Sequence, residues 1–248
     1  VGGERKNEIF SLSSRTLLNS CSQNHFNMRT YLISAFTLFL FSACSKTERI
    51  ENRNDQGVLI EKYDRRKDTY AKEGKYQAFY PNGKVFEESW YLNDTLHGER
   101  KLFYENGALQ SVEHLDHGRY TGPYLKYYEN GQLSNEGQYT DNEMSGTWKR
   151  YFDSGELMEE VTFSKNEENG PFKFYHKTGK MSVEGIFESG ENEQGELKKY
   201  DENGELVAKM LCFYGACATT WSKEDGDIKV DTARIRELGE IRKQSEKY

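Results

Sequence analysis

The chain has 248 residues, enough for one large domain or two small ones, and its formal net charge of −7 argues against a protein that grips the phosphate backbone of nucleic acids. Aromatic residues make up 14% of the chain, but all hydrophobic residues together make up only 35%. This balance excludes a thick aliphatic core and favours a thin β-sheet covered by Tyr and Phe, which pack well across strands.

The N-terminal region has the pattern of an export signal. Met28 and Arg29 precede an apolar run of 11 residues, Tyr31 to Phe41, and small residues follow it. A membrane-spanning helix needs about 20 such residues. We therefore interpret residues 28–43 as a signal peptide that directs the protein out of the cytosol. Residues 1–27 are interpreted as a disordered over-extension upstream of the true start.

Cys44 closes the sequence Phe-Ser-Ala-Cys, which resembles the bacterial lipobox, although Phe41 stands where that motif usually has Leu. The resemblance implies that Cys44 is the lipidated first residue of a mature lipoprotein in the bacterial cell envelope, held in the outer membrane and facing the periplasm or the cell surface. The alternative is an ordinary secretory signal cut near Ser45. Residues 44–56 are charged and poor in apolar residues, which predicts a tether.

Two series of glycines reveal an internal repeat. Within each series the spacing is 24 residues, with one step of 25, and the second series follows the first by nine residues. The two series are Gly74, Gly98, Gly122, Gly146, Gly170 and Gly195, and Gly83, Gly107, Gly131, Gly155, Gly179 and Gly204. They define six units over residues 74–218, and residues 57–73 are interpreted as a shortened N-terminal cap. The repeat domain as a whole is predicted to cover residues 57–221.

Each unit reads as a β-hairpin. A turn such as Glu-Asn-Gly lies between two aromatic-rich runs, and Asn and Gly tolerate the positive φ of tight hairpin turns. Apolar residues of the second run, such as Leu133 and Tyr139, are an even number of positions apart, so we expect them to share one face of the sheet. The sequence thus predicts an all-β protein: an elongated, single-layer antiparallel sheet of tandem hairpins whose ends need caps.

This pattern resembles the MORN repeat, in the variant found in bacterial proteins of the YwqK-type antitoxin family. The shared elements are the opening Gly-x-aromatic, the Glu-Asn-Gly turn and the closing Glu-Gly-x-aromatic of residues 136–139 and 184–187. The resemblance implies hairpin rods that serve as scaffolds and binding surfaces. It also implies an alternative function, an antitoxin-like protein binder in the cytosol.

Two cysteines, Cys212 and Cys217, lie close together near the end of the last unit. In an exported protein such a pair predicts a disulfide, here one that clips the end of the sheet. The alternative is two buried free thiols.

Other candidate chemistry is sparse. His114 and His117 flank Asp116, an arrangement in which metal binding is conceivable, but we interpret these histidines, and the isolated His97 and His176, as surface residues. Carboxylates are frequent without forming a distinguished pair. We therefore expect no catalytic residues, no metal and no cofactor.

The seventh position of the units carries a row of rings that could form a binding groove for a protein or glycan, or could simply hold neighbouring hairpins together. The residues are Tyr80, Tyr104, Tyr128, Phe152 and His176. The tail, residues 222–248, is predicted to hold a short helix that begins after Asp231 and covers the last strand. The resulting hypothesis is an envelope-anchored, non-catalytic binding or scaffold protein.

Overall fold

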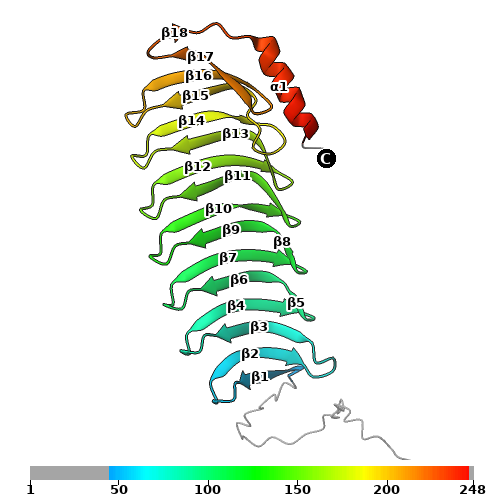
Figure 1. The fold of residues 1–248 in the computed structure, drawn as a ribbon. Coiled ribbons are helices and arrows are strands. Elements are labelled where there is room, and N and C mark those ends of the chain that lie inside the picture. The colour runs from blue at the N-terminus through cyan, green and yellow to red at the C-terminus, as the bar shows by residue number, and fades with distance from the viewer. Residues whose placement is uncertain (1–44, 246–248) are drawn as a thin grey trace, which may run out of the picture. The chain divides into compact units, whose positions relative to one another are not determined.

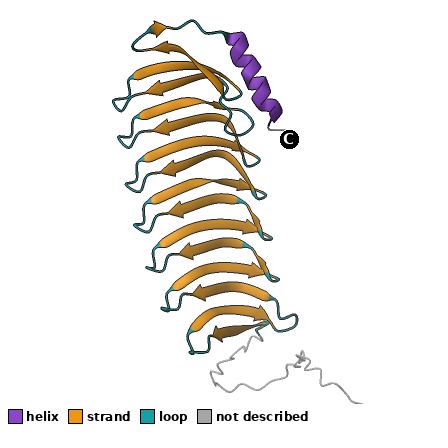
Figure 2. Ribbon diagram, viewed as in Figure 1, coloured by secondary structure: helices purple, strands orange, loops and turns teal. Residues whose placement is uncertain are grey.

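The computed structural model describes residues 45–245, and it confirms the predicted all-β fold of tandem hairpins. These residues form one open antiparallel sheet of 18 strands and one C-terminal helix (Figures 1 and 2). The elements are β1 (Thr47–Arg53), β2 (Leu59–Arg66), β3 (Lys72–Phe79), β4 (Val85–Leu92), β5 (Thr95–Leu96), β6 (Gly98–Phe103), β7 (Leu109–Asp116), β8 (Arg119–Tyr120), β9 (Gly122–Tyr127), β10 (Leu133–Thr140), β11 (Glu143–Tyr151), β12 (Leu157–Ser164), β13 (Glu167–Tyr175), β14 (Met181–Phe187), β15 (Gly195–Tyr200), β16 (Leu206–Phe213), β17 (Ala216–Ser222), β18 (Gly226–Asp227) and α1 (Thr232–Ser245).

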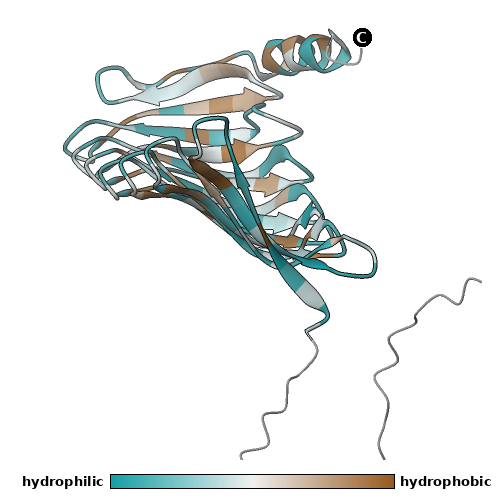
Figure 3. Cartoon of the chain, turned by 90° about the horizontal axis from the view of Figure 1, so that it is seen from below, coloured by the Kyte–Doolittle hydropathy of each residue, from teal (hydrophilic) through white to brown (hydrophobic). Residues whose placement is uncertain are grey.

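The strands pair in chain order. The six units correspond to the hairpins β3–β4, β6–β7, β9–β10, β11–β12, β13–β14 and β15–β16, each joined to the next by antiparallel pairing. The two-residue strands β5 and β8 pair with β4 and β7 where one hairpin passes to the next. Seen from one end of the stack, hydrophobic segments recur on successive strands (Figure 3).

The predicted tether over residues 44–56 is wrong for its central part, because Thr47–Arg53 is strand β1 and pairs with β2. Its charged residues meet opposite charges across the pair: Arg49 Nε lies 2.6 Å from Asp64 Oδ1, and Arg65 Nε lies 2.8 Å from Glu48 Oε1. The composition of this segment resembles that of a tether, but its backbone pairs with β2 from Thr47 to Arg53. The N-terminal cap therefore begins before residue 57 and includes the β1–β2 hairpin.

The Asn-Gly turns have a different geometry from the one expected. In the β9–β10 turn the Gly131 N–H donates to the Tyr128 carbonyl at 2.9 Å, and only Gly131 takes a positive φ, of 86°. Asn130 instead uses its side chain, whose Oδ1 accepts the Gln132 N–H at 2.9 Å. The glycine supplies the left-handed backbone and the asparagine braces the turn.

A register shift follows this turn and corrects the face assignment. Leu133 lies opposite Tyr127, but Asn135 lies opposite Lys126, so one residue of β10 bulges out of the pairing. Tyr139 lies opposite Gly122, five residues from Tyr127. Because directly paired residues share a face, Leu133 and Tyr139 lie on opposite faces, and the prediction that they share one is wrong.

The two faces of the sheet differ in chemistry. The aromatic face carries the third residue of each unit, and the Lys–Glu face carries a ladder of alternating charge across β10–β15. The third residues are Tyr76, Arg100, Tyr124, Trp148, Phe172 and Leu197. The ladder runs Glu136, Lys149, Glu160, Lys173, Glu184 and Lys198, each directly opposite the next. The principal buried cluster, of Val161, Phe172, Phe187, Leu197 and Cys212, belongs to the aromatic face.

Helix α1 packs against β16 and β17 beside the last hairpin. Asp231 is its N-cap, since Oδ1 accepts the backbone N–H groups of Ala233 and Arg234, both at 3.0 Å. Gly239 permits close packing, because a Cβ there would stand 2.2 Å from the Phe213 carbonyl oxygen. Within residues 45–245 there is no helix with the length and apolar character needed to cross a bilayer.

Candidate binding surface

Rings in mutual contact cover much of the aromatic face. Around the centre of the stack, Trp148 lies with its ring centroid 5.1 Å from that of Tyr139, 5.6 Å from Tyr124 and 6.2 Å from Phe163. The hairpins β3–β4, β9–β10, β11–β12 and β13–β14 contribute two or three rings each, and these rings pack on one another within and between hairpins. The row is a semi-exposed aromatic surface that is unbroken from Tyr120 to Phe187.

An ionic cluster interrupts this row near its N-terminal end. Arg100 Nε lies 3.0 Å from Glu87 Oε1, and Arg100 Nη1 lies 3.3 Å from Glu113 Oε2. The two glutamates are buried, at 7% and 6% exposure, so Arg100 between them offsets part of the cost of burying their negative charges.

The same region affects the ionisation of a neighbouring tyrosine. Burial, and then the negative charge of Glu113, raises the pKa of Tyr124 to about 12.

A groove opens on the aromatic face between β11 and the loop after β14. Its volume is about 550 Å³. It combines rings with carboxylates, and it is lined by Arg150, Glu159, Val161, Phe163, Glu168, Phe174, Phe187, Glu191 and Glu193. Arg150 forms an ion pair with Glu159, with Nη2 2.7 Å from Oε2. The remaining three glutamates make this groove acidic, with an apolar floor of phenylalanines.

The seventh-position residues link neighbouring hairpins. The hydroxyl groups of Tyr80, Tyr104 and Tyr128 donate to the backbone carbonyls of Phe103, Tyr127 and Tyr151 in the following unit, at 2.8, 2.7 and 2.8 Å. His176 repeats this contact, since its Nε2 donates to the Tyr200 carbonyl at 3.0 Å. Phe152 has no hydroxyl, and its ring lies under Lys177 Nζ of the next unit, 5.5 Å from the centroid.

These contacts support the second of the two interpretations of the row, a ladder that holds the hairpins together. The polar tip of four of its five members is directed at a neighbouring backbone carbonyl rather than at solvent. A binding role for the row stays a prediction.

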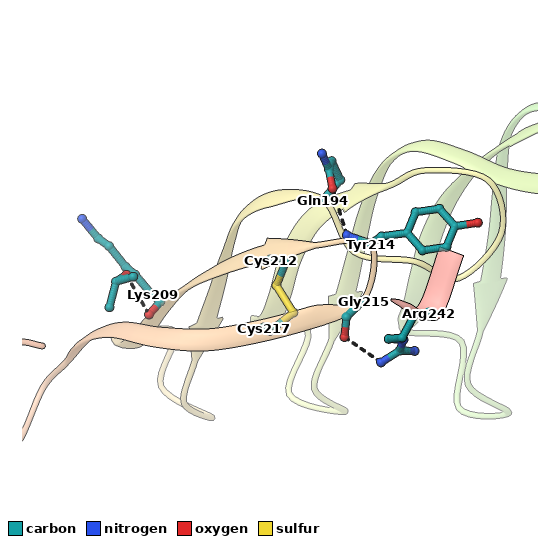
Figure 4. The surroundings of a disulfide bond; sticks show 8 residues. Gln194, Lys209, Cys212, Tyr214, Gly215, Cys217 and Arg242 are labelled. Carbon is teal, nitrogen blue, oxygen red and sulfur yellow. Dashed lines mark hydrogen bonds between the residues drawn. A yellow bond between two sulfur atoms is a disulfide. The ribbon is translucent and has the colours of Figure 1, made fainter. Parts of the chain in front are cut away.

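Cys212 and Cys217 are joined by a disulfide across the β16–β17 hairpin, with their sulfur atoms 2.06 Å apart (Figure 4). The hairpin turn that follows Cys212 is tied on both sides. The Tyr214 N–H donates to Gln194 Oε1 at 3.0 Å, and Arg242 of α1 donates from Nη1 to the Gly215 carbonyl at 2.8 Å. The disulfide and the helix thus lock the same hairpin.

The histidines His97, His114 and His117 lie at the surface, but their grouping differs from the sequence-based interpretation. His114 is separate from His117, since its Nδ1 lies 3.0 Å from the Pro123 carbonyl oxygen. His97, interpreted as isolated, lies beside His117 and Asp116, and the potential ligand atoms of these three residues are all within 4.8 Å of one another. The repeat could have revealed this cluster. His97 lies just before the first strand of a unit and His117 just after its second strand, and the pairing of these two strands brings such positions together at one edge of the sheet.

Cys44, the signal peptide over residues 28–43 and residues 1–27 lie outside the described residues. Their assignments remain predictions from the sequence.

The fold and its two faces define a tandem β-hairpin repeat protein. A sequence model described as the MORN repeat variant matches the chain over residues 72–93, 96–117, 120–141, 144–165, 168–189 and 193–212, more than half of its length. The protein therefore belongs to the MORN repeat variant family, and the six matched segments correspond to the six hairpins. No curated protein matches the chain with significant similarity.

Proposed function

We propose that this protein is a non-catalytic binding module whose ligand is a protein segment that carries both basic and apolar side chains. The observation that carries this proposal is the acidic, phenylalanine-floored groove on the aromatic face. A Lys or Arg side chain places its charge at a carboxylate while its aliphatic stem packs on a ring. An apolar neighbour in the same segment would cover the remaining rings.

Peptide binding tests this assignment. A fluorescently labelled peptide with alternating Lys and Phe should bind the full chain more tightly than a peptide of the same length with Glu in place of Lys, and binding should weaken as salt is added. The double variant Glu191→Gln, Glu193→Gln should lose affinity for the Lys peptide. The matched control, Glu143→Gln at the exposed start of β11, should not. Equal affinity for both peptides, or no effect of the double variant, would refute the proposal.

We further propose that Cys44 anchors this module to the bacterial cell envelope, in an outer-membrane lipoprotein. The support is the sequence alone: the signal peptide over residues 28–43 and the lipobox-like residues that end at Cys44. Growth with a palmitate analogue should label the protein, and Cys44→Ala should abolish the label. An unlabelled protein recovered in the cytosolic fraction would instead favour the antitoxin-like alternative.

A further inference from the structure

From the geometry of one edge of the sheet, we propose that His97, Asp116 and His117 bind a divalent transition-metal ion, with Zn²⁺ as the best match. His97 lies between β5 and β6, whereas Asp116 ends β7 and His117 begins the turn to β8. The ion would therefore join the segment that enters the β6–β7 hairpin to the segment that leaves it.

The donor atoms are already close to a metal-binding arrangement. His97 Nδ1 lies 3.2 Å from Asp116 Oδ1, and His117 Nδ1 lies 2.6 Å from the same oxygen. In a tetrahedral zinc site with bonds of 2.0–2.1 Å, neighbouring ligand atoms stand roughly 3.3 Å apart. Insertion of the ion therefore requires the His117–Asp116 pair to open by less than 1 Å and the two imidazole donors, which lie within 4.8 Å of each other, to reach a similar spacing. Side-chain rotations can supply both changes. Water would complete the coordination.

The backbone holds the two loops in place without the metal. The Gly118 N–H donates to the Leu96 carbonyl at 2.8 Å, and the His97 N–H donates to the Trp90 carbonyl at 2.9 Å. His117 and Gly118 both have positive φ, 48° and 79°, so the turn fixes the direction from which the imidazole leaves the chain. Both histidines are thus presented from defined positions, which lowers the entropic cost of ligation.

The local charge also favours a cation. Arg119, two residues after His117, is paired with Asp141, its Nε being 2.8 Å from Oδ1. Asp116 contacts the two imidazoles, and its carboxylate would bind the ion and offset one of its two positive charges. Imidazole and carboxylate ligands together suit Zn²⁺. The side chains are 44%, 61% and 69% exposed, so an ion can reach them directly from solvent.

Three other unit boundaries use a different link at this place, whereas Gly190 stands there at a further one and, like Gly118, offers only its backbone N–H. Asp94, Asn142 and Asn166 stand where this boundary has Gly118, and their Oδ1 atoms accept the backbone N–H groups of Lys72, Tyr120 and Met144 at 2.6, 2.6 and 2.7 Å. Gly118 has no side chain with which to make this bond. The His–Asp–His cluster lies at this boundary, and a metal ion there would supply the link between entering and leaving segments that the glycine, without a side chain, cannot.

Calorimetric titration of the untagged full chain with Zn²⁺ tests the site. The wild type should bind in a saturable manner, and Co²⁺ should give the intense visible absorption of a four-coordinate ion. The variants His97→Ser and His117→Asn introduce the residues found at the same place in other units, Ser145 and Asn93. Each should weaken Zn²⁺ binding about tenfold or more, since the loss of even an outer-shell partner costs roughly 10- to 100-fold.

His114→Ala is the matched control, because His114 lies in the same hairpin but outside the cluster. It should leave both the affinity and the Co²⁺ spectrum unchanged, and far-UV circular dichroism should show that all variants are folded. The proposal is overturned if the wild type shows no saturable Zn²⁺ binding. It is also overturned if both cluster variants bind as the wild type does, or if His114→Ala loses binding equally.

Discussion

The approach of Trp148 to Gly137 gives a sharp test of how the aromatic face is packed. Gly137 lies within β10, where its backbone is of a kind that any residue can adopt. A Cβ at this position would stand 2.1 Å from Trp148 Cδ2 and 2.3 Å from Cε2, far inside van der Waals contact. Gly137→Ala therefore probes the close approach alone and adds no backbone strain.

The expected cost follows from the surroundings of the indole. Trp148 is 8% exposed and is enclosed by Tyr124, Tyr139 and Phe163, so it cannot move away without disturbing the ring row. Overpacking of this kind costs about 1–3 kcal/mol. Replacement of a strand glycine by alanine returns about 0.5–1 kcal/mol of backbone entropy. With mid-range values for both terms, the net loss in the free energy of unfolding should be about 1 kcal/mol.

Urea denaturation followed by circular dichroism measures this loss, and a double-mutant cycle with Trp148→Ala identifies its cause. In the Trp148→Ala background the indole is gone, so Gly137→Ala should be neutral or slightly stabilising. An undiminished stability of Gly137→Ala alone would refute the reasoning. So would an equal loss in both backgrounds, since the methyl group would then be acting on something other than the indole.

Three further predictions concern the ladder, the end of the sheet and the tyrosines. Tyr104→Phe removes the hydroxyl that donates to the Tyr127 carbonyl and should lower the free energy of unfolding by about 1 kcal/mol in urea denaturation; no change would argue against a ladder role. Reduction of the Cys212–Cys217 disulfide, which closes a loop with a sequence separation of 5, should cost about 2 kcal/mol and lower the Tm, and an unchanged Tm would contradict it. Burial raises the pKa of Tyr124 to about 12, so its neutral form stabilises the fold fully below pH 10, and this contribution should be lost between about pH 10 and pH 12 as the unfolded chain ionises first. Tyr124→Phe should flatten the fall in Tm over that range, and an identical pH profile would show that another group is responsible.

The sequence predicted the hairpin stack because its signal is redundant. Six copies of one glycine spacing report the same hairpin six times, so a deviation in a single unit does not hide the architecture. The helix after Asp231 was predictable for a similar reason, since its N-cap is a local feature.

Features that depend on pairing across strands were not predictable in this way. The bulge after Gly131 places Leu133 and Tyr139 on opposite faces, and a period-two count along one strand cannot detect an extra residue that its partner strand lacks. Strand β1 is polar except for Ile50, so its composition alone does not distinguish it from a tether, and its strand structure is evident only from its pairing with β2.

The His97, Asp116 and His117 cluster was missed for a related reason. Two histidines 20 residues apart gave no local motif. Only the β6–β7 register, which pairs Gly98 with Leu115, brings the two imidazoles together at the open end of that hairpin, with ring centroids 5.2 Å apart.

The ladder bonds have a consequence for the length of the protein. Each tyrosine of the row donates to a carbonyl 23 residues further on, and the acceptor unit offers the next donor in turn. A duplicated 24-residue segment placed between two units would therefore find its acceptors and donors ready on both sides. Each such duplication should extend the stack by about 10 Å, the width of two strands, while the terminal hairpins remain unaltered. The reach of this protein can thus be set by copy number alone, without the redesign of any contact.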